Sequence, residues 1–447
     1  MTEVATVSIV AKNKYSGKAG GLPHPTRGGT KVRKPFTRVI TEKRYFKGQL
    51  QPLARPRRCT LSWKALVYGS IASVGIGLCQ EARSATTPVT SPWPLPLEMR
   101  VPFEPTAFPS ADRTYLTYEL YLTNFGTAPL TLRRIEVIDA AASATEPIAA
   151  FEPAQLNTLL QRVGDPIVGD QIPAADDNSR RQLAAGASVV VYLSIALQRG
   201  AHVPDRLRHR LFTSDSTVEG APLGTHHTQL HVLGPPVEGA NWQASGGPSN
   251  DSHHRRGILV MEGSAVISRR YAIDWLQIEN GTTFTGDVRD KRSYHAYGKP
   301  VLAVADSTVV TAKDGLPENV PGHNEEFHPA VPITIDTISG NTIALKLSGG
   351  QFAYYFHLQP GSLRVKVGDR VRRGQILARI GNSGDAREPH LHFEVTTSST
   401  LMAGEGVPYL IDQYRVKSTD DASQIRTREL PLKDMQIDFG QGRGELY

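Results

Sequence analysis

Apolar and polar residues alternate with a period of two over long stretches of this chain. In the segment TYLTYELYLTNFG, alternate residues fall on opposite faces of an extended strand. The face expected to be buried carries Leu116, Tyr118, Leu120 and Leu122. Similar segments follow, separated by turn residues and without a long helical period: NFGTAPLTLRRIEVID, QLAAGASVVVYLSIAL and HTQLHVLG. Short strands in this order predict an all-β sandwich over residues 95–235.

A segment rich in Pro, Gly, Ser and Asn, VLGPPVEGANWQASGGPSN, indicates a boundary after this domain. We therefore expect a linker over residues 236–255. Runs with β patterning resume behind it, in RRYAIDWLQI, GKPVLAVADSTVVTA and GQFAYYFHL, and predict a second β domain over residues 256–415 with a C-terminal extension over 416–447. The cluster NFGTAPLTL resembles those of immunoglobulin-like modules, which implies that the first domain is an immunoglobulin-like β-sandwich serving as a spacer or docking domain.

The N-terminal part of the chain has a different composition. Residues 1–60 are rich in Gly, Pro and basic residues and have almost no apolar periodicity, so we expect a disordered basic leader. Residues 61–85 contain an uncharged, mostly apolar run between Lys64 and Gln80, preceded by RPRR. That pattern fits an export signal peptide, and a short uncleaved anchor is the alternative. A lipoprotein signal at Cys79 is disfavoured because Leu78 precedes it.

The distribution of charge and of cysteines bears on two questions, whether the protein binds nucleic acid and in which compartment it works. The chain carries a net charge of +7, but the leader through Arg58 has 14 Lys and Arg against Glu3 and Glu42, a net +12 that leaves −5 for the rest. The folded part therefore has no need of a nucleic-acid partner. Both cysteines, Cys59 and Cys79, lie in the N-terminal part. Cleavage would leave a thiol-free exported protein in the periplasm or cell envelope, which meets a membrane only through the N-terminal segment if that segment stays uncleaved.

Candidate chemistry is concentrated in the second domain. In EPHLHFEV the apolar residues take one face of a strand, while His390, His392 and Glu394 take the other. Asp274 lies in the apolar segment YAIDW, where a carboxylate is costly to bury unless it is paired or binds a metal. His357 ends the strand segment FAYYFHL.

These segments, in their order, resemble the lysostaphin-type zinc metallopeptidases, which cut peptidoglycan cross-bridges. The resemblance covers about residues 255–410 and rests on the Asp strand, GKPVLAVADSTVV, YYFHL, VKVGDRVRRGQ, GNSG and the final His-Leu-His. It implies a β-sheet peptidase domain in which Asp274 and His392 bind Zn²⁺. It also implies that His357 and His390 hold and deprotonate the attacking water and stabilise the oxyanion.

The resemblance fails at one ligand, because Arg270 stands where the family has its first zinc-binding histidine. Arginine stays protonated and has no lone pair to offer a metal. His253, His254 and His295 are the candidates for a third ligand. We favour His254, on the hypothesis that the adjacent Arg255 and Arg256 flank an anionic cleft.

Each candidate also has an ordinary structural explanation. Asp274 could pair with Arg269 or Arg270, His357 could bond to backbone at a strand end, and His390 and His392 could be solvated. Glu394 could orient a histidine or be an exposed carboxylate. The long loop over residues 313–329 supplies further remote ligand candidates: His323, Glu325, Glu326 and His328.

Three functions follow from these observations. The first is a secreted zinc endopeptidase that hydrolyses amide bonds in peptidoglycan peptides. The second is a non-catalytic member of the same fold that binds and regulates another cell-wall hydrolase or an envelope protein, and Arg270 favours it. The third, a biotinyl or lipoyl carrier hairpin at VKVGDRVRRGQILARIG, is disfavoured because the segment has no Met-Lys pair.

Overall fold

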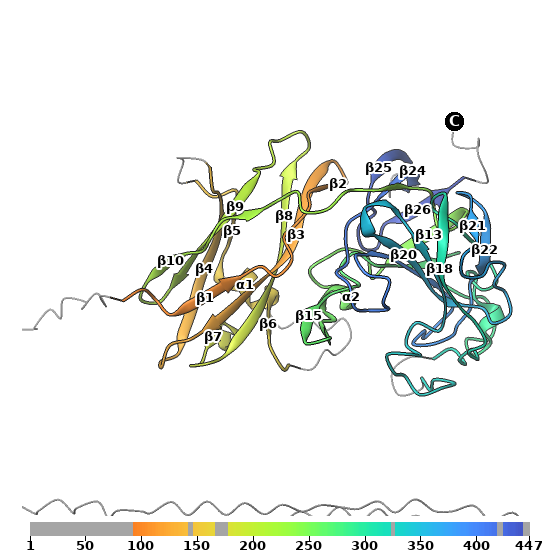
Figure 1. Ribbon diagram of the computed structural model, residues 1–447, viewed down its shortest axis with the longest axis horizontal. Coiled ribbons are helices and arrows are strands. Elements are labelled where there is room, and N and C mark those ends of the chain that lie inside the picture. The colour runs from red at the N-terminus through yellow and green to blue at the C-terminus, as the bar shows by residue number, and fades with distance from the viewer. Residues whose placement is uncertain (1–92, 142–145, 166–177, 323–326, 418–422, 441–447) are drawn as a thin grey trace, which may run out of the picture. The chain divides into compact units, whose positions relative to one another are not determined.

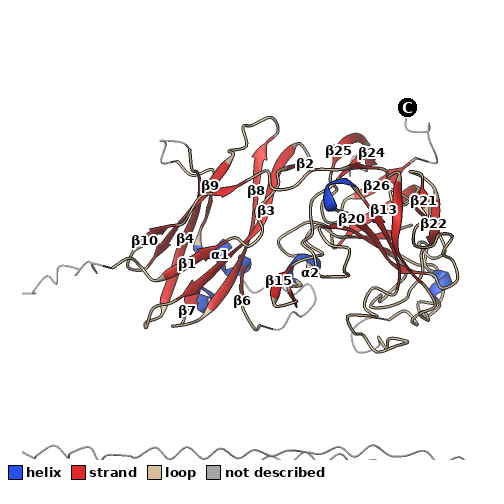
Figure 2. Cartoon of the chain, viewed as in Figure 1, coloured by secondary structure: helices blue, strands red, loops and turns tan. Residues whose placement is uncertain are grey.

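The computed structural model describes residues 93–141, 146–165, 178–322, 327–417 and 423–440, and strands dominate them (Figures 1 and 2). The helices in these ranges are short, as α1 (Pro153–Leu159) and α2 (His253–Arg256) illustrate. The predicted all-β class is confirmed. Within the described ranges, no helix has the length and apolar character needed to cross a bilayer. The predicted leader, the signal segment, Cys59 and Cys79 lie outside the described residues.

Two sheets form the N-terminal domain. One holds β1 (Leu97–Arg100), β2 (Phe108–Ser110), β3 (Arg113–Asn124), β6 (Leu160–Arg162) and β8 (Ser188–Gln198). The other holds β4 (Leu130–Asp139), β5 (Ala149–Phe151), β7 (Gln182–Leu183), β9 (Arg206–Thr213), β10 (Thr217–Glu219) and β11 (Leu223–Gly224). One buried cluster takes residues from both sheets, among them Leu120 of β3 and Ile135 of β4. The two sheets therefore pack through a common core, and the immunoglobulin-like likeness stays a prediction.

The buried face of β3 agrees with the alternation in its sequence. Leu116, Leu120 and Leu122 are fully buried in the core between the sheets. The opposite face is also covered, since Glu119 is only 2% exposed. The contacts of that carboxylate reach into the second domain and are described below.

An 11-stranded sheet organises the C-terminal domain. Its strands run in the order β12 (Val232–Leu233), β24 (Leu410–Val416), β26 (Gln436–Phe439), β13 (Gly239–Ser245), β16 (Ile273–Gln277), β23 (Leu391–Thr396), β20 (Phe352–Leu358), β19 (Asn341–Lys346), β18 (Ser307–Lys313) and β21 (Arg370–Val371), with β25 (Gln424–Glu429) paired to β24. Two smaller pairs join β14 (Leu259–Met261) to β15 (Ser264–Val266), and β17 (Pro300–Leu302) to β22 (Ile376–Arg379).

The structure corrects two expected boundaries. The range 236–255 is not a plain linker, because it contains β13, which pairs with β16 and β26 inside the sheet. The range 416–447 contains β25 and β26, so it is part of the domain rather than an extension. The Pro- and Gly-rich composition of this segment obscured a short alternation of buried and less buried residues. Trp242 and Ala244 point into the core and are both fully buried.

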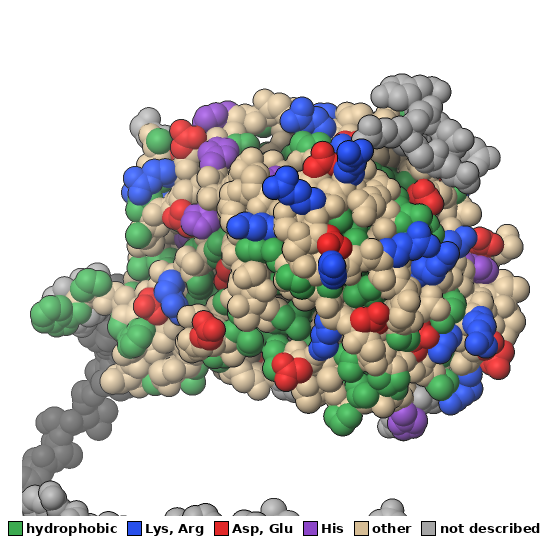
Figure 3. All heavy atoms as spheres, turned by 45° about the vertical axis from the view of Figure 1, so that its right-hand side comes forward, with side chains coloured by type: hydrophobic (Ala, Val, Ile, Leu, Met, Phe, Trp, Pro, Cys, Tyr) green, Lys and Arg blue, Asp and Glu red, His purple; other side chains and the backbone are tan. Residues whose placement is uncertain are grey.

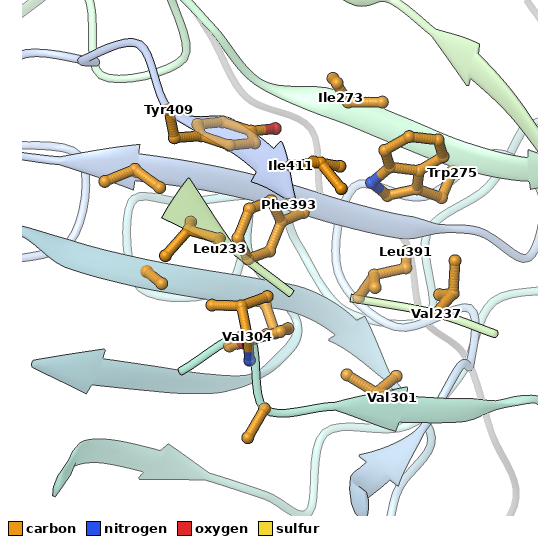
Figure 4. Packing of buried hydrophobic residues seen from close by; sticks show 14 of the residues in the cluster. Leu233, Val237, Ile273, Trp275, Val301, Val304, Leu391, Phe393, Tyr409 and Ile411 are labelled. Carbon is orange, nitrogen blue, oxygen red and sulfur yellow. The ribbon is translucent and has the colours of Figure 1, made fainter. Parts of the chain in front are cut away.

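The core of this domain lies against one face of the central strands (Figure 4). Ile273 and Trp275 of β16 pack there with Leu391 and Phe393 of β23, and all four are at most 1% exposed. Because side chains alternate along a strand, the residues between them must point to the opposite face. Those residues are Asp274 and His392.

Charges of both signs are interspersed on the face of the molecule drawn in Figure 3. Lys and Arg side chains lie among Asp and Glu side chains, and no single-sign patch covers that face. This mixture is consistent with the excess positive charge of the chain residing in the residues before the folded part.

Gly384 is required by a close approach of two backbone segments near β20, the strand that carries His357. Its φ is +73°, and a Cβ there would lie 2.3 Å from the backbone nitrogen of Gly340. We expect Gly384→Ala to lower the free energy of unfolding by more than about 3 kcal/mol, because the clash adds to a backbone strain of roughly 1–3 kcal/mol. Denaturant unfolding monitored by tryptophan fluorescence measures the loss.

Gly368→Ala is the matched control, because Gly368 also has a positive φ, +92°, but has open space around its Cα. Only the strain remains there, so we expect a smaller loss than at Gly384. Equal losses in the two variants would contradict the role assigned to the contact with Gly340.

Candidate metal centre

A row of four residues crosses neighbouring strands at the candidate site. Ser245 of β13 is the register partner of Asp274 of β16, Asp274 is the partner of His392 of β23, and His392 is the partner of Phe356 of β20. Directly opposed residues on antiparallel strands place their side chains on the same face. The sheet register therefore brings Asp274 and His392 together on the face opposite the core.

Three imidazoles surround the carboxylate of Asp274. Nδ1 of His392 lies 2.9 Å from its Oδ1, Nε2 of His254 lies 3.2 Å from its Oδ2, and Nε2 of His390 lies 3.4 Å from its Oδ1. Burial would raise the pKa of Asp274, but His254 and His390 outweigh it and hold that pKa well below the usual value. Asp274 is therefore a buried carboxylate that keeps its charge.

His254 reaches the site from α2, the next element of the chain after the strand β13. Its Nδ1 donates to the carbonyl of Gly246 over 2.9 Å, so Nε2 is the nitrogen that faces Asp274. Gly246 has a φ of +58°, and a Cβ there would lie 3.0 Å from the His254 ring. A glycine is thus required both for the turn after β13 and for the approach of this imidazole.

The protonation state of His254 indicates whether a metal ion fits between His254 and Asp274. Burial lowers the pKa of His254 to about 3, although Asp274 opposes that shift. A neutral His254 with its proton on Nδ1 presents a lone pair from Nε2 to a carboxylate oxygen 3.2 Å away. Two lone pairs at that distance repel each other unless a cation or a proton lies between them. The donor set is therefore one that a metal ion satisfies.

His392 is held on both of its nitrogens. Nδ1 contacts Asp274 and Nε2 lies 3.4 Å from Oε2 of Glu394, while Phe356 stacks on the ring with centroids 4.8 Å apart and an angle of 5°. Burial lowers the pKa of His392, but Asp274 and Glu394 outweigh it and raise the pKa to about 9. Glu394 is 1% exposed, so it is not the solvated carboxylate that the sequence also permits.

His357 and His390 form a pair beside this group. Nδ1 of His357 donates to the carbonyl of Ser383 and Nδ1 of His390 donates to the carbonyl of Glu388, each over 2.8 Å. Their ring centroids are 4.8 Å apart. His357 is the penultimate residue of β20 and has a φ of +62°, which turns its backbone out of the extended conformation. Both residues are buried, and both present Nε2 on the side away from the carbonyl that fixes Nδ1.

The structure thus gathers all five side chains singled out from the sequence: Asp274, His254, His357, His390 and His392. The ligating atoms of His253, His254 and Asp274 lie within 4.8 Å of one another, a spacing that could hold a metal ion. His253 is the more remote imidazole, with Nε2 3.9 Å from Oδ2 of Asp274 and a side chain that is 35% exposed.

Other candidates lie elsewhere. Nδ1 of His295 lies 3.7 Å from Glu279. His328 is exposed on its loop. His323, Glu325 and Glu326 fall outside the described residues.

Two explanations offered for the arginines are wrong. Arg270 does not pair with Asp274, because Nε contacts Glu119 and Nη2 contacts Glu405, each over 2.8 Å. Arg255 does not flank a cleft, because it is fully buried and binds Glu119. The sequence pattern identified the histidines and Asp274, whereas the backbone carbonyls that fix the rings and the stacking of Phe356 depend on tertiary structure and left no signal in the sequence.

Comparison with known protein families matches part of the C-terminal domain. Residues 293–403 match peptidase family M23. These residues therefore form part of a peptidase M23 domain. The M23 match contains His357, His390 and His392 but begins after His254 and Asp274, so the placement of those two side chains rests on the structure of this chain.

Curated relatives match the same part of the chain. A glycyl-glycine endopeptidase of Staphylococcus capitis is 44% identical over 74 residues, which are 16% of this chain and 20% of that protein. The cell division protein DipM of Caulobacter vibrioides is 29% identical over 122 residues, 27% of this chain and 16% of that protein. The chain therefore spans about a fifth or less of the length of these relatives.

Among solved structures, the catalytic domain of lysostaphin from Staphylococcus simulans is similar at 22% identity and a TM-score of 0.20. That alignment covers 39% of this chain and 88% of the lysostaphin domain.

Proposed function

We propose that this protein is an exported zinc-dependent endopeptidase that hydrolyses amide bonds in peptidoglycan peptides in the periplasm or cell envelope. The observation that carries the proposal is the carboxylate of Asp274 facing three buried imidazoles at 2.9 to 3.4 Å. The M23 domain supports the reaction class, and the similarity to a glycyl-glycine endopeptidase supports peptide substrates.

Asp274, His392 and His254 would hold the zinc ion. Oxygen from Asp274, Nδ1 from His392 and Nε2 from His254 make three protein donors, the number typical of catalytic rather than structural zinc sites. When bound, zinc supplies a Lewis acid that polarises a peptide carbonyl and lowers the pKa of water to about 7. Glu394 would keep the proton of His392 on Nε2, which leaves Nδ1 as the donor toward the metal.

His390 and His357 would handle the protons of the reaction. Because Nδ1 of His390 donates to the Glu388 carbonyl, Nε2 is the atom that takes a proton from the attacking water and passes it to the leaving nitrogen. His357 is fixed on the Ser383 carbonyl, and burial holds its pKa well below the usual value, so its neutral Nε2 would accept a hydrogen bond from the attacking water. The carbonyls that hold both rings reduce the reorganisation needed at each step.

A non-catalytic role remains the second candidate, favoured by Arg270, which the sequence places where the family resemblance expects its first ligand. In this alternative the domain binds peptidoglycan or regulates a cell-wall hydrolase without cutting. The placement of His254 beside Asp274 opposes it, because that imidazole restores a third donor from a different segment. Zinc binding together with wall digestion separates the two functions.

The ligand assignment predicts that His254→Ala abolishes tight zinc binding. We expect the zinc dissociation constant to rise by more than about 100-fold, since loss of a direct ligand exceeds the roughly 10–100-fold effect of removing an outer partner. Competition against a chromophoric chelator measures it. His253→Ala is the matched control and should change the constant by less than about threefold, because this imidazole is more remote and partly exposed. Equal losses in the two variants would show that His254 is not the specific third ligand.

Zinc loading should release a proton from His392. Its pKa of about 9 keeps it protonated in the metal-free protein at pH 7.5, below that pKa, and Nδ1 must lose its proton to bind a metal. We expect close to one proton released per zinc at pH 7.5 and less as the pH approaches 9. Calorimetry in two buffers of different ionisation enthalpy measures this number. Glu394→Gln should reduce the release at pH 7.5 because it removes one cause of the raised pKa, and an unchanged number would contradict the assignment.

The His390→Ala variant should no longer hydrolyse peptidoglycan but should still bind zinc. We expect the rate of turbidity loss of purified peptidoglycan to fall by about 10²- to 10⁴-fold, the usual contribution of a positioned acid–base group. His328→Ala is the control, since it removes an exposed imidazole of the same domain. Lysis by His390→Ala at the wild-type rate would exclude His390 from the reaction. Zinc binding by the wild type without any lysis would favour the non-catalytic alternative.

A further inference from the structure

Glu119 of β3, a buried carboxylate of the N-terminal domain, contacts the segments that carry the candidate metal centre. Oε1 of Glu119 lies 2.8 Å from Nε of Arg255, and Oε2 lies 2.8 Å from Nε of Arg270. All three side chains are almost fully buried, with exposures of 2%, 0% and 4%. Glu119 is therefore shared by two arginines that lie in different segments of the C-terminal domain.

The remaining donors of these arginines are also satisfied. Nη2 of Arg255 donates to the carbonyls of Tyr118 and Leu193, over 2.7 and 2.9 Å. Nη1 of Arg270 donates to the carbonyl of Gly406 over 3.0 Å. Burial would raise the pKa of Glu119, but the two guanidinium groups outweigh burial and lower it. A charge cluster of this kind holds its geometry tightly, because removing one member leaves a buried charge uncompensated.

The two arginines adjoin two of the candidate metal ligands. Arg255 directly follows His254 in α2, and Arg270 precedes Asp274 by four residues. Asp274 is held by pairing of β16 with β13 and β23. His254 has no such support, because α2 is a single helical turn and a helix of that length is not stable by itself. Its local contact to Gly246 is supplemented by the anchoring of Arg255 on β3.

We propose that Glu119 is a positioning residue for the metal centre, acting through Arg255 to hold His254 against Asp274. The M23 domain of this chain would then depend on the N-terminal domain for its third ligand. This proposal rests on the proposed function, because it requires that His254 bind zinc. Glu119 itself touches none of the ligating atoms.

Glu119→Gln in the full chain tests the proposal with zinc alone as the ligand. We expect the zinc dissociation constant to rise by about tenfold or more, as for loss of a residue that orients a ligand. Glu405→Gln is the matched control, because Glu405 also binds Arg270 but makes no contact with Arg255 in the described residues. It should leave the constant within about twofold of the wild-type value.

A double-mutant cycle distinguishes positioning from a general effect of charge or stability. On a His254→Ala background, Glu119→Gln should cause no further weakening, because the ligand it positions is gone. Weakening of equal size on both backgrounds would overturn the proposal, and so would an unchanged constant in Glu119→Gln alone. A wild-type chain that binds no zinc would overturn the proposed function as well, so the two failures are distinguishable.

Arg255→Lys covers the case in which Glu119→Gln does not fold. Lysine keeps the charge near Glu119 but loses the planar fork that reaches Glu119, Tyr118 and Leu193 together. We expect the zinc dissociation constant to rise in Arg255→Lys. On the His254→Ala background the same substitution should cause no further rise. Wild-type affinity in Arg255→Lys would count against positioning through this arginine.

Discussion

The buried charge of the Asp274 carboxylate is the main physical constraint on the site in the C-terminal domain. A charged oxygen pair removed from water must be offset by positive charge or by donors, and here three imidazoles from two segments, α2 and the start of β23, meet it. Each imidazole then has its other nitrogen fixed, by the carbonyls of Gly246 and Glu388 or by Glu394. The strand order β13, β16, β23, β20 is consistent with this requirement, because it places the strands of Asp274 and His392 side by side.

The same alternation that builds the core builds the site. Ile273 and Trp275 are buried on one face of β16, so Asp274 between them must emerge on the other. Leu391, Phe393 and His392 repeat this relation on β23. A shift of one residue in the pairing of these strands would bury the charged groups in the core and expose the aromatic ones. Packing energy in the core thus protects the register of the polar face.

Local pattern was sufficient for part of this structure and insufficient for the rest. The two-residue period identified β3, the strand of Asp274 and the strand of His392, because a half-buried strand must alternate. It did not identify β13 or β26, since their segments are short and rich in turn residues. The burial of Glu119 was also hidden, because that residue lies on the polar face of β3 and is covered only by arginines more than 130 residues later in the chain. Long-range charge pairing of this kind has no local signature.

The central position of β23 in the sheet limits how far the chain can be truncated without exposing a new sheet edge. The stretch matched by the family, residues 293–403, includes β23 and β20 but leaves out β16 and β13, which continue the sheet on the other side. A fragment trimmed to that stretch would turn an interior strand into an open sheet edge, with unpaired amides and carbonyls offered to any extended peptide. The intact sheet therefore needs more of the chain than residues 293–403, the segment that matches the family.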